Sequence, residues 1–156
     1  AGRCTTAEYF VAILDSLLRQ GHRPADLVHM LRHCPVRVRR LVAHTDLADS
    51  GTESLVRFRL RAAGIRVRPQ VRIHGVGRVD LLVGSRLVLE VDSRAHHSAP
   101  DAYVTDRDRD LALARLGYDR LRVTYEHVLH RWDEAFAAIM TIIRRGDHRR
   151  TPRPIT

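Results

Sequence analysis

Three acidic residues interrupt two apolar stretches in the middle of the chain. Asp80 lies in residues 79–83, and Glu90 and Asp92 lie in residues 87–92. All the remaining residues of these two stretches are valine or leucine. An ionised carboxylate among buried apolar side chains is costly unless a cation or a hydrogen-bond donor compensates its charge. Carboxylate oxygens are the ligands that Mg²⁺ and Mn²⁺ prefer. The pattern therefore predicts either a bound cation or a hydrogen-bond donor beside these acids.

The turn between the two stretches decides whether these acids meet. Alternate side chains of a strand share a face, so Glu90 and Asp92 are expected on one face, roughly 7 Å apart. A two-residue turn at 84–85 would pair Asp80 with Leu89 and send Asp80 and Glu90 to opposite faces. A three-residue turn at 84–86 pairs Asp80 with Glu90 directly. A metal site that contains Asp80 and Glu90 requires the three-residue turn.

Apolar periodicity, capping residues and prolines predict the elements that position the acids. Helices are expected at residues 5–20, 24–33, 35–46, 50–63, 98–116 and through 132–143. Strands are expected at residues 67–73, 78–83, 87–92 and 121–124. Pro69 assigns the first strand to a sheet edge, and the wholly apolar run 87–89 makes the third strand central and covered on both faces.

These elements predict an α/β fold whose core runs α-β-β-β-α-β-α around a mixed central sheet, after short N-terminal helices. We expect a helical extension over residues 1–49, one α/β domain over 50–145 and a basic tail over 146–156. A chain of 156 residues is long enough for one such domain with its own core.

Composition indicates the class of partner. The formal net charge is +9, and all 27 basic side chains are arginine. Arginine binds phosphate with paired hydrogen bonds, which favours a nucleic-acid partner, although a coding bias would produce the same composition. No apolar run reaches the ~18 residues of a membrane span, so no membrane is expected. Two cysteines and the lack of a signal region predict a cytoplasmic location.

A set of short motifs resembles a known family. The motifs are Gly77-Arg-Val-Asp80, Leu89-Glu-Val-Asp92, His97, Asp106, Arg109-Asp110, Leu113, Gly117-Tyr118 and Leu121-Arg122. Together they are similar to a bacterial domain of the PD-(D/E)xK nuclease superfamily, allied to very-short-patch-repair (Vsr-like) endonucleases. The resemblance covers roughly residues 50–145 and implies a restriction-endonuclease-like fold.

The resemblance also implies a reaction and roles for residues. Asp80 and Glu90 would be metal ligands, Glu53 the helix-borne acid and a further ligand, and Asp92 stands where the superfamily usually has lysine. The implied activity is an endonuclease that uses Mg²⁺ or Mn²⁺ to hydrolyse phosphodiester bonds, in DNA rather than RNA. His97 would move a proton or hold the phosphate. The expected nucleic-acid contacts are Arg78, Arg94, Arg109 and Arg122.

Other interpretations stay open. Glu53 fits a capping box with Ser50, and Asp92 could simply pair with Arg78 across the hairpin. The missing lysine, together with Ser93 in place of the usual glycine, would suit a degenerate site that binds nucleic acid or protein without cleaving. A toxin-like ribonuclease is a further alternative.

The N-terminal region suggests a larger protein. Residue 1 is Ala rather than Met, so we expect a processed chain or part of a longer one. Residues 1–49 resemble the helices that connect an upstream winged-helix module to this kind of domain.

Overall fold

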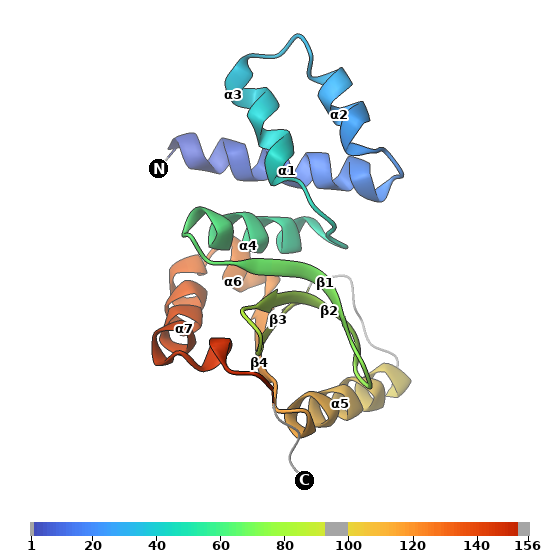
Figure 1. Cartoon of the computed structure of the whole chain (residues 1–156), viewed down its shortest axis with the longest axis vertical. Helices are drawn as coiled ribbons and strands as arrows, with labels where there is room; N and C mark the ends of the chain where they lie inside the picture. The colour runs from blue at the N-terminus through green and yellow to red at the C-terminus, as the bar shows by residue number, and fades with distance from the viewer. Residues whose placement is uncertain (1, 93–99, 153–156) are drawn as a thin grey trace. The chain divides into compact units, whose positions relative to one another are not determined.

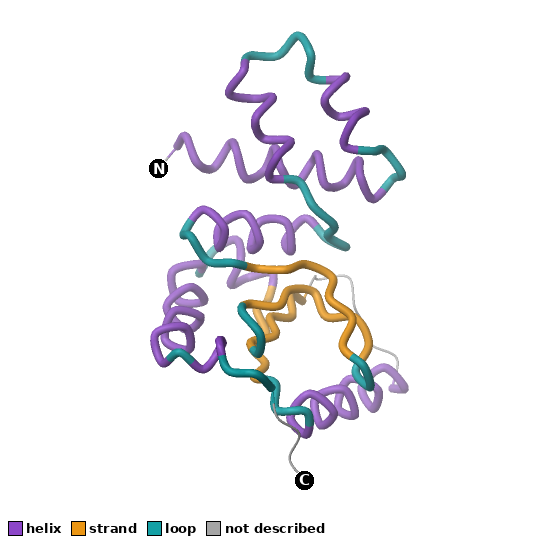
Figure 2. Tube along the Cα trace, in the orientation of Figure 1, coloured by secondary structure: helices purple, strands orange, loops and turns teal. Residues whose placement is uncertain are grey.

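The computed structural model in Figures 1 and 2 describes residues 2–92 and 100–152. By its internal contacts the chain forms two units, Ala1–Ile65 and Arg66–Thr156. The domain boundary that the sequence suggested, at residue 50, remains a prediction. None of the described helices is both long enough and apolar enough to cross a bilayer.

The first unit is entirely helical. Its elements are α1 (Gly2–Arg19), α2 (Pro24–Met30), α3 (Val36–Arg39), the 3₁₀ helix η1 (Arg40–His44) and α4 (Gly51–Ala62). Val11 and Leu14 of α1 and Leu27 of α2 are buried. Ser50 caps α4 by accepting a hydrogen bond from the Glu53 backbone N–H, as its sequence pattern predicted.

The single helix expected over residues 35–46 is wrong. The chain tightens into a 3₁₀ turn after Arg39, and Thr45 is already extended, with φ −72° and ψ 150°. Long-range hydrogen bonds explain the early end, because the His44 carbonyl accepts from Arg57 (2.6 Å) and the Asp46 N–H donates to Asp15 (3.0 Å). These bonds satisfy backbone groups that would otherwise continue the helix.

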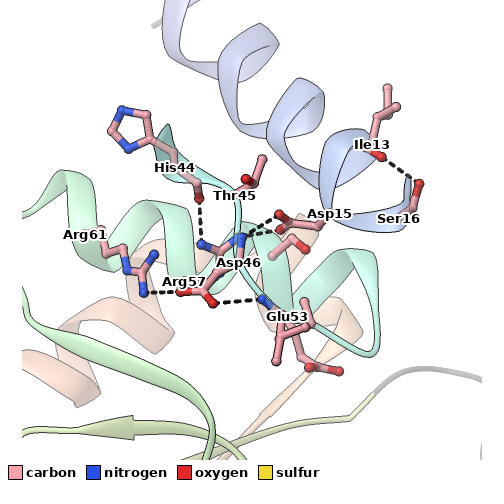
Figure 3. Close-up of polar contacts among 12 residues, drawn as sticks. Ile13, Asp15, Ser16, His44, Thr45, Asp46, Glu53, Arg57 and Arg61 are labelled. Atoms are coloured by element: carbon pink, nitrogen blue, oxygen red, sulfur yellow. Dashed lines mark hydrogen bonds and ion pairs between the residues drawn. The ribbon is translucent and has the colours of Figure 1, made fainter. Parts of the chain in front are cut away.

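A buried ion pair holds the first unit together. Figure 3 shows Arg57 of α4 between the carboxylate of Asp15 on α1 and the carbonyl of His44. Arg57 and Asp15 are 0% and 1% exposed at their side chains, and their charged groups are in direct contact. Burial lowers the pKa of Arg57, and the charge of Asp15 opposes this shift. Each of the two buried charges is therefore compensated by the other.

The second unit is built on a four-stranded mixed sheet. The strands β1 (Val67–Ile73), β2 (Gly77–Val83), β3 (Leu87–Asp92) and β4 (Asp119–Thr124) lie side by side in that order. The first two pairings are antiparallel, and β3 and β4 are parallel. Pro69 lies in the edge strand β1, as expected, and β3 is central, with Leu87–Val91 buried.

Helices cover both faces of this sheet. Figure 1 shows α5 (Pro100–Arg115), the crossover from β3 to β4, on one side and α7 (Trp132–Arg145) on the other. Leu113 of α5 packs with Leu82 and Val88 in the core. The α/β fold with a mixed central sheet is confirmed. The sequence did not predict α6 (Tyr125–Leu129), which begins where the Thr124 hydroxyl accepts from the His127 N–H.

The buried pair leads to a stability prediction. Asp15→Asn leaves the Arg57 charge uncompensated in an apolar setting, so we expect the free energy of unfolding to fall by about 3 kcal/mol or more. Glu134→Gln, which removes the exposed pair between Arg131 and Glu134 (2.9 Å), is the control and should leave the free energy of unfolding nearly unchanged. Urea denaturation measures both. Equal losses would contradict the assignment of Arg57 and Asp15 as the central contact of this unit.

Candidate active site

The register of the β2–β3 hairpin brings two of the acids together. Leu81 pairs with Leu89 and Val83 with Leu87, around a turn at residues 84–86. Continuing this register places Asp80 opposite Glu90. Asp80 also accepts a hydrogen bond from the Val91 N–H (2.8 Å), which fixes its carboxylate beside β3. The hairpin therefore has the three-residue turn that the metal site requires.

Gly84 and His148 lock this turn. Gly84 has φ +62°, and a Cβ at this position would lie 2.3 Å from the His148 carbonyl oxygen. The Ser85 N–H donates to the same oxygen (2.7 Å). Only glycine fits such a close approach at a left-handed backbone conformation. The 3₁₀ turn η2 (Asp147–Arg149), which follows α7, thus helps to set the register of the two acids.

Arg109 of α5 reaches over the sheet to the acid pair. Its Nη2 donates to Glu90 Oε1 (2.8 Å) and also to the backbone carbonyl of Arg78. Glu90 is only 7% exposed, while the Arg109 side chain is 29% exposed. Leu113, one turn further along α5, packs in the apolar cluster with Leu82 and Val88. The acid pair thus lies at the border between the apolar core and α5.

The environment of Glu90 raises its pKa to about 7, from an ordinary value of 4.5. Burial is the largest cause, and the neighbouring charge of Asp80 and a hydrogen bond with its carboxyl group add to it, while Arg109 and Arg120 act in the opposite direction. A carboxyl group that is difficult to ionise, beside a second carboxylate, is a site where a further cation would be stabilised.

Strand β4 contributes two arginines beside β3. Glu90 is the pairing partner of Arg122, and Val88 that of Arg120. Arg122 donates to both oxygens of Asp106 on α5 (2.6 Å each), and its Nε lies 3.4 Å from Asp92. We call the resulting group the acid–arginine cluster. Its acids are Asp80, Glu90, Asp92, Asp106 and Asp110, and its arginines are Arg109, Arg120 and Arg122.

The outer acids of the cluster differ in their electrostatics. The hydrogen bond from Arg122 holds the pKa of Asp106 below its usual value. Asp92, at the end of β3, has a side chain that is 47% exposed, and partial burial nevertheless raises its pKa, with Arg122 opposing the shift. Asp92 is therefore the acid of β3 that solvent reaches most easily.

Glu53 has a local role in the first unit. Its carboxylate accepts from the Asp49 N–H (2.9 Å) and the Ser50 hydroxyl (2.9 Å), and it is 4% exposed. This is the capping arrangement that the sequence offered as one interpretation. The metal-binding role of Glu53 remains a prediction.

Two of the expected site residues, Arg94 and His97, lie outside the described residues, as does Ser93. Among the residues that are described, no group of three or more His, Cys, Asp or Glu side chains is arranged to hold a metal ion. The acid pair of the hairpin provides two carboxylates, those of Asp80 and Glu90, and not a group of three.

Sequence reasoning missed Arg120 as a site residue and gave Asp106 and Asp110 no role beyond their place in the family motifs. Arg120 is in contact with both acids, at 3.3 Å from Asp106. The available signal was the alternation of Arg120 and Arg122 in a strand expected to lie parallel to β3. With the correct register, that alternation sends both arginines to the face of Glu90.

The turn yields a prediction about the register. Gly84→Ala should lower the free energy of unfolding by roughly 2–4 kcal/mol. Alanine is strained at this positive φ, and its methyl group would overlap the His148 carbonyl. Gly75→Ala is the matched control, since Gly75 also has a positive φ (+77°) but open space around its Cβ position. That control should cost about 1 kcal/mol. Thermal or urea unfolding gives both values, and equal costs would show that His148 does not lock the turn.

The shifted pKa gives a second prediction. In metal-free protein, ¹³C NMR should show Glu90 titrating near pH 7, and Asp80→Asn should lower that pKa because it removes a neighbouring charge. The folded state then holds the Glu90 proton more tightly than the unfolded state, so stability from this group is lost as pH rises from about 4.5 to 7. Asp80→Asn should flatten this loss. Asp108→Asn, at an exposed position of α5, should leave both measurements unchanged. A Glu90 pKa near 4.5 would contradict the described environment.

Comparison with known proteins identifies the family. No curated protein and no solved structure matches the chain. The model of the restriction-endonuclease-like family REase_MTES_1575 matches residues 53–143, a span that runs from α4 through the sheet to α7. This match covers more than half of the 156 residues and contains the whole acid–arginine cluster. The chain therefore belongs to the restriction-endonuclease-like family REase_MTES_1575.

Proposed function

We propose that the chain is a metal-dependent endonuclease that hydrolyses phosphodiester bonds, with DNA preferred over RNA. The observation that carries the proposal is the contact between Asp80 and Glu90, in a restriction-endonuclease-like domain whose family name indicates a nuclease. We further assign it to the PD-(D/E)xK superfamily and to its Vsr-like branch, on the motifs around these two acids.

The residues present suit a divalent cation. Two carboxylates meet at the border of the apolar core, and burial together with the charge of Asp80 raises the pKa of Glu90 to about 7. Oxygen donors of this kind fit Mg²⁺ or Mn²⁺. Asp80 and Glu90 would hold the ion. When bound, such an ion lowers the pKa of an attacking water and stabilises the charge that develops on the phosphate.

The other residues of the cluster are suited to the remaining steps. Asp92 is half exposed and partial burial raises its pKa, so it accepts a proton more readily than an ordinary aspartate. Arg122 lies beside it with a side chain that is 38% exposed, and can neutralise charge on a phosphate. We propose nucleic-acid contacts for Arg78, Arg94 and Arg109 and a proton-transfer or phosphate-binding role for His97.

The setting of this domain is also a proposal. We place the nuclease domain at residues 50–145, with a helical extension before it and a basic tail after it, in a cytoplasmic protein that carries an upstream winged-helix module.

One observation favours a second candidate, a binding module without catalysis. The acids Glu90, Asp92, Asp106 and Asp110 each have a guanidinium partner within 4 Å, as expected of a cluster that only stabilises the fold. Such a module would still bind nucleic acid through its arginines, and its binding would weaken steeply with salt.

Cleavage assays separate the two candidates. Plasmid DNA and a structured RNA are incubated with Mg²⁺ or Mn²⁺ and with the wild type, Asp80→Asn, Glu90→Gln or the control Asp108→Asn. Each site variant should lose roughly 100-fold or more in rate, because metal catalysis contributes several kcal/mol to the barrier. The exposed control should retain the wild-type rate.

Three results would redirect the proposal. Salt-sensitive binding without cleavage of either substrate would support the binding module. Cleavage of the RNA alone would support a toxin-like ribonuclease. Cleavage that survives both site substitutions would remove Asp80 and Glu90 from the mechanism.

A further inference from the structure

Arg109 is the guanidinium group in direct contact with Glu90. Its guanidinium group lies 2.8 Å from Glu90 Oε1, and the same nitrogen is bonded to the Arg78 carbonyl. Its charge lowers the pKa of Glu90, against the effects of burial and of Asp80. In the described protein, therefore, an arginine from α5 supplies positive charge to the acid pair.

The Arg109 guanidinium also has a donor to spare. Its Nε is buried and has no hydrogen-bond partner among the described residues. A buried donor without a partner is costly, and a guanidinium binds two oxygens of one carboxylate or phosphate best through two parallel hydrogen bonds. Here Nη2 makes both of the bonds described. The arrangement leaves Arg109 able to gain hydrogen bonds by moving to a bidentate oxyanion.

The neighbouring arginines bind other acids, although Nε of Arg120 is likewise buried without a hydrogen-bond partner among the described residues. Arg122 is bonded to both oxygens of Asp106 and lies near Asp92, and Arg120 contacts Asp106 and Asp110. These partners lie on α5 or at the end of β3. Among the described residues, Arg109 is the arginine of the cluster that is hydrogen-bonded to Glu90 itself, so its movement would free the Glu90 carboxylate.

We propose that Arg109 exchanges Glu90 for a phosphate of the nucleic-acid strand, and that this exchange makes cation binding and nucleic-acid binding cooperative. Without nucleic acid, Glu90 must give up Arg109 before it can bind a cation, so cation affinity is low. With a phosphate to receive Arg109, Glu90 is released and the cation replaces the lost charge. Linkage then requires that the cation strengthen nucleic-acid binding by the same factor.

The inference rests on the proposed function for the identity of both ligands, but it is tested by binding alone. Ca²⁺ is titrated calorimetrically into the protein with and without a short duplex DNA, because Ca²⁺ binds oxygen ligands as Mg²⁺ does and is measurable as a ligand in its own right. The DNA is checked for integrity on a gel after each titration. The proteins compared are the wild type, Arg109→Gln and Arg115→Gln, a control with the same charge change at an exposed position of α5.

DNA should increase the Ca²⁺ affinity of the wild type about fivefold or more, within the usual range of coupling between sites. Arg109→Gln should bind Ca²⁺ more tightly than the wild type when DNA is absent, and DNA should no longer change that affinity. Arg115→Gln should behave as the wild type. Arg109→Met, which keeps the aliphatic stem, replaces the glutamine variant if circular dichroism shows that the latter is unfolded.

The outcomes separate this inference from the nuclease proposal. Coupling that persists in Arg109→Gln, or Ca²⁺ affinity that this substitution does not raise, overturns the exchange even if the protein cleaves DNA. Coupling that depends on Arg109 in a protein without cleavage supports the exchange and overturns only the nuclease. Absence of Ca²⁺ binding from all variants overturns the exchange as well.

Discussion

Asp80 and Glu90 lie opposite each other at the border of an apolar core, and the site depends on this contact between like charges. Two carboxylates in such a setting repel, and burial makes Glu90 harder to ionise. The protein meets this cost by protonating Glu90 up to a pH near 7 and by bringing in Arg109. A divalent cation would compensate the pair more fully, but it would have to displace Arg109 from Glu90.

The scaffold sets this contact through elements distant in sequence. Residue 148, after the last long helix, holds the hairpin turn, and α5 carries Arg109 to the acids while Leu113 anchors the helix in the core. Strand β4 adds Arg120 and Arg122 through its parallel register with β3. A substitution in any of these elements would alter the electrostatic environment of Glu90 although residue 90 itself stays the same.

Local patterns predicted the backbone well and the side-chain partners less well. The order of the strands, the edge position of Pro69 and the central position of β3 followed from alternation and proline chemistry. The end of the third helix could not be predicted in this way, because hydrogen bonds with the distant side chains of Arg57 and Asp15 compete with helix formation there. Likewise, the partners of Asp106 and Asp110 did not follow from the helix sequence, because Arg120 and Arg122 come from β4.

A crystal structure with Mg²⁺ and DNA bound tests the central claim most directly. The account predicts one ion with an oxygen of Asp80 and an oxygen of Glu90 at about 2.0–2.1 Å, the distance of magnesium ligands. Arg109 should then be hydrogen-bonded to a phosphate of the DNA. A structure in which DNA is bound while Glu90 keeps Arg109, with the ion elsewhere or held by neither acid, would contradict it.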